Sequence, residues 1–205
     1  MAAKLIHQLL GAFLTILVLQ TFVAGQGSYG SPDGVGPPAS DHTFQSDDND
    51  TPPSGWNSLP LTYGFLSNSS LPAGLDLEVV TSIIDDAFQV WQVPVPTFAF
   101  QMISSGEDAN IKIAFVPLDP SYYGFGYFPP DGRLYLDNSH TSWSTGSSPA
   151  SDEVDLMSAA LHVIGGTLGL GNSNDSSAVM YPILNLGSIK RELSQEDITR
   201  IQALY

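Results

Sequence analysis

The sequence of 205 residues contains no cysteine. Disulfide bonds therefore contribute nothing to its stability, although an oxidising compartment would permit them. The thiolate ligands that structural zinc sites often use are excluded as well. A metal site in this chain has to draw on His, Asp, Glu or Asn side chains.

Basic residues are also scarce. Six Lys and Arg residues stand against 21 Asp and Glu residues, which gives a formal net charge of −15. Nucleic acids and anionic lipid surfaces are bound by clusters of positive charge. The composition therefore argues against both as partners, and solubility is the simplest role for the acidity.

Only the N-terminus has an apolar run that approaches the length of a membrane span. Residues 1–25 have the pattern of a secretory signal peptide, with Lys4 near the start, an apolar or small run over 9–19, and small residues at 23–25 for cleavage. Because about 20 apolar residues are needed to span a bilayer, we expect cleavage and secretion rather than the alternative, a membrane anchor. We expect no membrane contact after cleavage.

A linker and one folded domain follow. Residues 26–54 are rich in Gly, Ser, Pro and Asp and have little apolar periodicity, so we expect a disordered linker. Residues 55–205 are long enough for one domain with a sizeable core. Glycosylation triplets at Asn49, Asn68 and Asn174 suit a secreted glycoprotein.

Three stretches of the domain have the apolar spacing of helices. They cover about 75–92, 152–169 and 194–204. Ser151 is expected to cap the second helix, with the two acidic residues after it in the first turn. The letters "SQED" give the third helix a capping-box pattern.

Strand candidates lie between these helices. They are rich in β-branched and aromatic residues, and one of them alternates apolar with polar side chains. The candidates are residues 59–66, 97–103, 110–116 and 132–137. The order of strand, helix, strands, helix, loop and helix contains no repeat and does not require a second domain.

The letters "LHVIGGTLGLGNS" in the second helix match part of a zinc-protease motif. In the full motif H-E-x-x-H-x-x-G-x-x-H, three His bind zinc, the Glu is the general base, and the Gly turns the chain back. Here the pattern starts at His162 and its Gly falls on Gly169. Val163 stands at the base position, and Gly166 and Asn172 stand at the other two ligand positions.

Other short motifs flank this helix in a recognisable order. They are "LTYGF", "AFQVW", "TFAF", "ANIKIAF", "FPPDGRLYLD", "AVMYP" and "LSQEDITRIQALY". Together they resemble the matrixins, the matrix metalloproteinase catalytic domains of the metzincin clan, and most of all the plant branch. With the order of periodic segments, this resemblance implies an α+β metzincin-type fold with a twisted, mostly parallel sheet and three helices. It also places Met180 at the Met-turn.

The resemblance implies metal sites that the residues here do not reproduce. A matrixin binds its catalytic zinc with three His and uses a Glu as base, and this chain keeps only His162. Gly126 and Tyr135 occupy positions aligned with two His of a structural zinc site. Asp137 matches a calcium-binding Asp, but His140 replaces its Glu partner. The family's inhibitory propeptide Cys is absent. The letters "SPDGV" match the propeptide segment around that Cys only weakly.

We therefore expect a secreted matrixin-fold protein that has lost peptidase chemistry and needs no cofactor. His162 is then a half-buried histidine bonded to a neighbour, Asn172 a turn residue and Met180 a core residue. The first alternative is an active zinc endopeptidase that acts on extracellular proteins, with His162 as one ligand. The second is a metal-free peptide-binding or interaction domain, and the third a small secreted fold unrelated to proteases.

The resemblance also implies that an extended peptide lies along an edge strand of the sheet. Here that edge is expected at residues 124–128, where Phe125, Tyr127 and Phe128 could provide apolar contacts. The alternative is that these aromatics fold inward and fill the space left by the lost structural metal. The expected partner is thus an extended peptide or an extracellular protein.

Overall fold

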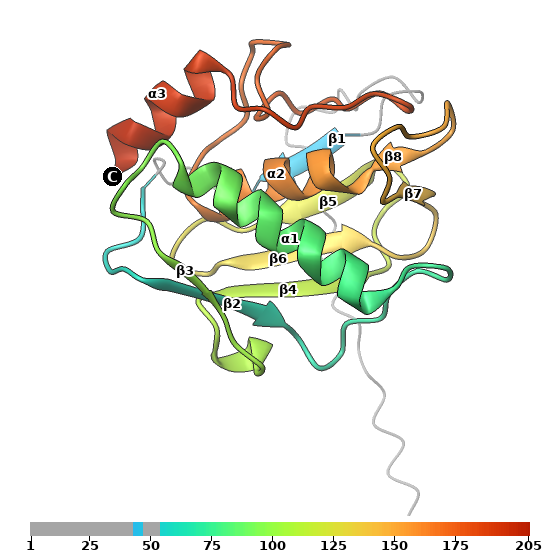
Figure 1. Ribbon diagram of the computed structural model, residues 1–205, viewed down its shortest axis with the longest axis horizontal. Coiled ribbons are helices and arrows are strands. Elements are labelled where there is room, and N and C mark those ends of the chain that lie inside the picture. Colours follow the sequence, from blue (N-terminus) through green and yellow to red (C-terminus); the bar gives the residue numbers. More distant parts are fainter. Residues whose placement is uncertain (1–42, 47–53) are drawn as a thin grey trace, which may run out of the picture. The chain divides into compact units, whose positions relative to one another are not determined.

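The computed structural model describes residues 43–46 and 54–205. Three helices and a six-stranded sheet make up most of this part, and α1 and α2 lie side by side over one face of the sheet (Figure 1). The strands are β1 (Thr43–Ser46), β2 (Leu61–Phe65), β3 (Phe100–Met102), β4 (Ile111–Val116), β5 (Tyr122–Gly126) and β6 (Arg133–Asp137).

The sheet has the order β1-β5-β6-β4-β2-β3. Every neighbouring pair is parallel except β5 and β6, which are antiparallel. The expected twisted, mostly parallel sheet of an α+β fold is therefore confirmed in its strand directions. The four strand candidates of the sequence all contain a strand, and each strand is shorter than its candidate.

The helices are α1 (Leu77–Gln92), α2 (Leu156–Thr167) and α3 (Gln195–Leu204). The first follows Asp76, whose side chain accepts hydrogen bonds from the backbone N–H groups of Glu78 and Val79. The third begins at Ser194 with the predicted capping box to Asp197. All three helices were expected from the apolar spacing.

The start of α2 differs from the prediction. Ser151 does not cap this helix; Asp155 does, and its carboxylate accepts from the N–H of Ser158. Val154–Asp155 (β8) first pairs in parallel with Trp143–Ser144 (β7), which keeps the chain extended until residue 155. The apolar spacing does not reveal this short strand pairing. The helix therefore begins at residue 156, four residues after the predicted start at residue 152.

The core lies between the sheet and the two helices. Phe88 and Trp91 of α1 are fully buried, and Phe88 stacks on Tyr63 with ring centroids 4.1 Å apart. The indole N–H of Trp91 donates to the carbonyl oxygen of Leu161 at 2.9 Å. This bond joins α1 to α2 directly beside the residue that starts the motif.

Strand β1 falls inside the segment 26–54 that was expected to be disordered. It pairs in parallel with β5, so residues 43–46 are a correction to that expectation. The expectation that residues 124–128 form the edge of the sheet was also wrong, because β1 lies outside β5. Most of the rest of the linker and the whole predicted signal peptide 1–25 lie outside the described residues. Within the part that is described, no helix has the length and apolar character that crossing a membrane requires.

Candidate functional site

Helix α2 carries three of the motif positions, His162, Val163 and Gly166, into the interior. All but one of its twelve residues are buried, because it is packed by α1, by the sheet and by the loop around Met180. A helix enclosed in this way is apolar on every side. The only ionisable side chain on it is His162.

His162 is a buried, neutral histidine. It is 3% exposed, so the expectation of a half-buried residue was wrong in degree. Its Nδ1 lies 2.8 Å from the carbonyl oxygen of Val179. Because a carbonyl only accepts, we assign the ring hydrogen to Nδ1. Burial lowers the pKa of His162 to about 4, although the bond to Val179 raises it.

Asn172, at the third ligand position, lies against the same imidazole. Its side chain hydrogen-bonds His162 and raises the pKa of that residue against the larger effect of burial. The first and third ligand positions thus interact with each other.

Val163, at the position of the catalytic base, packs directly on the sheet. It is 1% exposed, and a Cβ atom placed on Gly124 would lie only 2.7 Å from its Cγ1. A Cβ atom on Gly126 would lie 2.8 Å from the Val163 carbonyl oxygen. The two glycines of β5 therefore allow strand and helix to approach closely, and the aliphatic side chain fills the contact.

Gly166, at the second ligand position, faces the same strand. A Cβ atom there would meet Gly126 at an ordinary distance of 3.9 Å. The site thus lacks a donor at this position because the residue has no side chain, and a methyl group could be accommodated. His162, Val163 and Gly166 thus lie on one helix, and Asn172 interacts with His162 from the segment that follows it.

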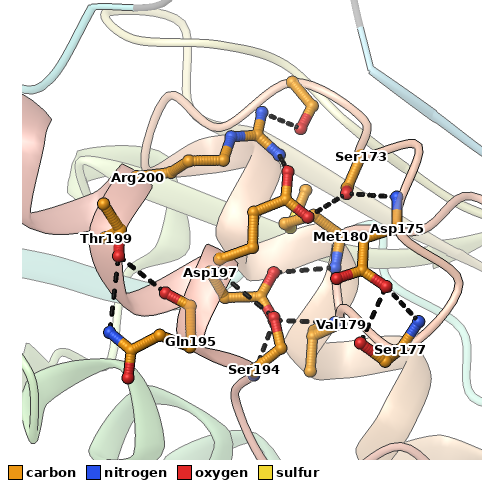
Figure 2. A network of polar contacts seen from close by, with 12 residues as sticks. Ser173, Asp175, Ser177, Val179, Met180, Ser194, Gln195, Asp197, Thr199 and Arg200 are labelled. Carbon is orange, nitrogen blue, oxygen red and sulfur yellow. Dashed lines mark hydrogen bonds and ion pairs between the residues drawn. The ribbon is translucent and has the colours of Figure 1, made fainter.

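The Met-turn is fixed from α3. The carboxylate of Asp197 accepts from the N–H of Val179 at 2.8 Å and from the N–H of Met180 at 3.1 Å, and it also bonds Ser194 (Figure 2). Asp197 and Met180 are both fully buried, so the expectation that Met180 is a core residue is confirmed. Sequence reasoning noticed the capping box of Asp197 but missed its role in shaping this turn.

A second network closes the loop that follows α2. The hydroxyl of Ser173 donates to Glu196 of α3 (Figure 2). The N–H of Ser173 donates to the carbonyl oxygen of Met180 at 2.8 Å. Arg200 lies 3.7 Å from Glu196 and donates to the carbonyl oxygen of Gly171. These bonds hold the segment around Asn172 in place from the side of α3.

The residues aligned with the family's calcium site satisfy one another. The carboxylate of Asp137 is buried and accepts from the N–H groups of Ser139, His140 and Thr141. Burial raises the pKa of Asp137, but these backbone and hydroxyl bonds outweigh it and hold the pKa well below its usual value. The Nδ1 of His140 lies 3.1 Å from the same carboxylate.

The aromatic residues near β5 pack on the sheet face away from α2. Gly124 and Gly126 point toward α2, so side-chain alternation turns Phe125 to the opposite face. There Phe125 and Tyr127 lie 4.6 Å apart, Tyr127 lies 6.1 Å from Tyr135, and Arg133 covers the Tyr127 ring. Phe125 and Tyr127 thus lie on the outer face of the sheet, which differs from the alternative that these aromatics fold inward.

The donor set at the motif does not fit a catalytic zinc. Such a zinc takes three protein ligands and a water, and its preferred nitrogen donors are represented here by one imidazole. Gly166 supplies no atom and Asn172 supplies a neutral amide. Across residues 43–46 and 54–205, no group of three or more His, Cys, Asp or Glu residues could hold a metal ion.

The fold and this site together indicate the class of protein. A mostly parallel sheet with one antiparallel strand beside a helix, followed by a Met-turn and a last helix, is the arrangement that the resemblance to metzincin catalytic domains implied. Residues 55–205 match the family described as Matrixin, and the chain belongs to this family.

Relatives of the chain come from plants and animals. It is 36% identical over 179 residues to metalloendoproteinase 1 of Glycine max, covering 81% of this chain and 56% of the relative. It is 33% identical to metalloendoproteinase 1-MMP of Arabidopsis thaliana, covering 73% and 44%. For interstitial collagenase B of Mus musculus the identity is 30%, covering 73% and 33%. The chain thus spans about half of the first relative and less of the others.

Two of the three predicted glycosylation triplets can be located. Asn68 follows β2, Asn174 follows the motif, and both are exposed. Asn49 lies outside the described residues. Exposure is required for a glycan acceptor, so Asn68 and Asn174 remain predictions with suitable positions.

Proposed function

We propose that this matrixin is a secreted pseudoenzyme, which does not hydrolyse peptide bonds and acts by binding an extended peptide or an extracellular protein. The observation that carries the proposal is the place of Val163. A buried aliphatic side chain, packed on the backbone of β5, stands where the family places its general base. Valine has no group that can take a proton from water.

The size of the missing contributions supports the loss of chemistry. A positioned acid–base group accelerates a reaction by roughly 10²–10⁴-fold. Zinc adds to this because it lowers the pKa of a bound water to about 7. The motif positions provide neither the base nor three ligands, and the remaining imidazole is engaged by Val179 and Asn172.

The binding function draws support from the edge of the sheet. An extended chain adds to a sheet edge mainly through backbone hydrogen bonds, which need few particular side chains. This mode of recognition can therefore outlast the loss of zinc ligands. Secretion is inferred from residues 1–25, and the net charge of −15 disfavours nucleic acid as the partner.

The competing function is a working zinc endopeptidase, which is what the names of the plant relatives describe. Native mass spectrometry in micromolar zinc and a fluorogenic peptide library separate the two. We expect no stoichiometric zinc and no cleavage. One tightly held zinc that disappears in His162→Ala, accompanied by cleavage, would overturn the pseudoenzyme proposal.

A rebuilt motif provides the positive control. The triple variant Val163→Glu, Gly166→His and Asn172→His restores the base and both missing ligands. We expect it to bind zinc, and we expect the same variant with His162→Ala to bind far less. Zinc binding by the triple variant alone would attribute the lost metal site to these three positions, and peptide cleavage by it would show that the cleft is still accessible.

A further inference from the structure

Helix α1 has more apolar side chains than its packing on the core uses. The side chains that face the core are fully buried, and they are Val80, Ile84, Ala87, Phe88 and Trp91. A second apolar row runs beside them at helical spacing, and its members are Val79, Ile83, Val90 and Val93. Val79 is 42% exposed and Val93 is 82% exposed, so both ends of this row reach solvent. In Figure 1 no other helix or strand of the described part lies over the outer side of α1.

Acidic side chains border this row, and α1 contains no basic residue. Glu78 and Asp86 are exposed on the helix, and the exposed Asp76 precedes it. An open hollow is lined by Val79 and Ile83 and by polar side chains of the same turns, among them Asp76 and Glu78. The outer side of α1 thus combines apolar contact area with negative charge.

The cations of the domain are engaged away from α1. Each Lys and Arg side chain of residues 54–205 donates to a carbonyl or carboxylate oxygen outside this helix. These side chains are Lys112, Arg133, Lys190, Arg191 and Arg200. All of them are only partly exposed. None of these bonds reaches α1, so its negative charge is open to a basic partner, which opposite charge attracts over about a Debye length.

We propose that the row from Val79 to Val93, with Glu78 and Asp86 beside it, is a docking face for a basic amphipathic helix of an extracellular protein. A partner helix of about 14 residues matches the length of the row, which is about 21 Å. Its apolar side chains pack on the row, as in other helix-in-groove complexes, and its Lys or Arg side chains lie opposite the two carboxylates. A second copy of this chain fits less well, because an α1 face would then meet a face of the same charge. The inference goes beyond the proposed function, since it names a surface outside the sheet edge and the chemistry of its partner.

A designed peptide tests the docking face. The probe is a fluorescently labelled helix of about 14 residues with Leu on one face and Lys on the others, and its binding to the full chain is followed by fluorescence anisotropy. We expect saturable binding that weakens at least about three-fold between about 50 and about 200 mM NaCl. The same peptide with Ser in place of every Leu, or with Glu in place of every Lys, should bind at least about ten-fold more weakly.

Apolar variants locate the binding on α1. Val79→Ser with Val93→Ser removes apolar contact at both exposed ends of the row, so the Leu and Lys peptide should bind at least about five-fold more weakly. Thermal unfolding checks that the variant stays folded. Chemical-shift mapping of the wild-type protein needs no variant, and the peptide should shift the amides of residues 77–93 and leave those of α3 unchanged.

Charge variants separate this face from the general acidity of the protein. Glu78→Gln with Asp86→Asn removes two charges beside the row and should weaken binding at least about three-fold. The matched control is Asp152→Asn with Glu192→Gln, which removes two exposed charges outside α1 and should bind like the wild type.

Three results would overturn the docking face. The first is equal affinity of the peptide for the wild type and both α1 variants, and the second is an equal loss in the control pair, which would reduce binding to general attraction of charges. The third is self-association of the wild type that both α1 variants abolish, which would make a second copy the occupant. None of these measurements reads zinc or cleavage. Failure here therefore leaves the proposed loss of peptidase chemistry untouched, and cleavage by the wild-type protein would leave the docking face standing.

Discussion

The Nδ1 atom of His162 lies 2.8 Å from the carbonyl oxygen of Val179, the residue before Met180. The bond ties α2 to the Met-turn and satisfies a buried polar group at both ends. The side chain of Asn172 also interacts with this imidazole, which is therefore a structural cross-link. A residue expected from the family to bind metal thus contributes to the folded state, and this role can be measured.

Stability should fall in acid because of His162. Its pKa is lowered from 6.5 in the unfolded chain to about 4 in the folded protein. The stabilising contribution is complete above pH 6.5 and is lost as the pH falls through 4, because the unfolded chain takes up a proton first. The full difference is about 3 kcal/mol.

Urea unfolding at pH 7.5 and pH 4.5 measures this contribution. His162→Gln should be less dependent on pH in this window than the wild-type protein, since the other titrating groups are common to both. Gln195→Ala is the control, because this side chain is exposed and does not titrate, and the variant should keep the wild-type dependence. Equal slopes for wild type and His162→Gln would contradict the prediction.

Asp197 should be the residue of α3 that matters most for stability. Removing its carboxylate leaves the buried N–H groups of Val179 and Met180 without acceptors. We expect Asp197→Ala to lower the free energy of unfolding by about 3 kcal/mol, and Asp197→Asn to lower it less. The exposed Gln195→Ala on the same helix should stay within about 0.5 kcal/mol of wild type. A loss below about 1 kcal/mol in Asp197→Ala would refute this account of the turn.

Chelators should barely affect folding. A structural zinc can supply about 10–16 kcal/mol to a small domain, and the carboxylate of Asp137 already has four backbone and hydroxyl partners within its own turn. We expect the melting temperature in excess EDTA to stay within about 2 °C of that in zinc and calcium. A drop of ten degrees or more, reversed by adding one metal back, would reveal a metal that stabilises the fold.

The helices could be predicted because apolar spacing and capping residues are signals that lie close together in the sequence. The interiors of α1, α2 and α3 follow from that spacing. The predicted start of α2 was wrong because β8 forms by pairing with β7, and no local signal in the sequence indicates that pairing. Strand β1 was missed for the same reason, since its partner β5 lies far along the chain and the surrounding composition is typical of a linker.

The candidate residues of the site could be chosen from the sequence, but their contacts could not be predicted from it. Motif spacing alone selected His162, Gly166 and Asn172 as the candidate positions. The partner of the imidazole, the Val179 carbonyl, could not be read from the sequence, because any backbone oxygen carries the same group. The fit of Val163 against Gly124 likewise arises from the packing of a helix on a strand.

Two neighbouring glycines of α2 should respond to alanine with opposite signs. At Gly166 a Cβ atom would find ordinary contacts of 3.9 Å, so Gly166→Ala should stabilise the helix by about 0.5–1 kcal/mol. At Gly165 it would lie 2.4 Å from Sδ of Met180 and 2.8 Å from the Trp91 ring, both fully buried. Gly165→Ala should therefore cost about 1–3 kcal/mol. Urea unfolding of the pair checks the signs, and a stabilised Gly165→Ala would show that the interior is looser than described.

The closed contact between α2 and β5 can be tested by a double-mutant cycle. Gly124→Ala places a methyl group 2.7 Å from Cγ1 of Val163 and 3.1 Å from the Tyr135 carbonyl oxygen, so it should destabilise the protein by about 1–3 kcal/mol. Val163→Ala removes Cγ1 and leaves a cavity. In the double variant each change relieves the other, and the two losses should add to more than the combined loss by at least about 0.5 kcal/mol. The recovery should be incomplete, because the backbone oxygen of Tyr135 stays in place. The matched control is the cycle of Gly126→Ala with Val163→Ala. A Cβ atom on Gly126 meets the backbone oxygen of residue 163 and not its side chain, so these two losses should simply add. Simple additivity in the Gly124 cycle would mean that Val163 does not close the site against β5.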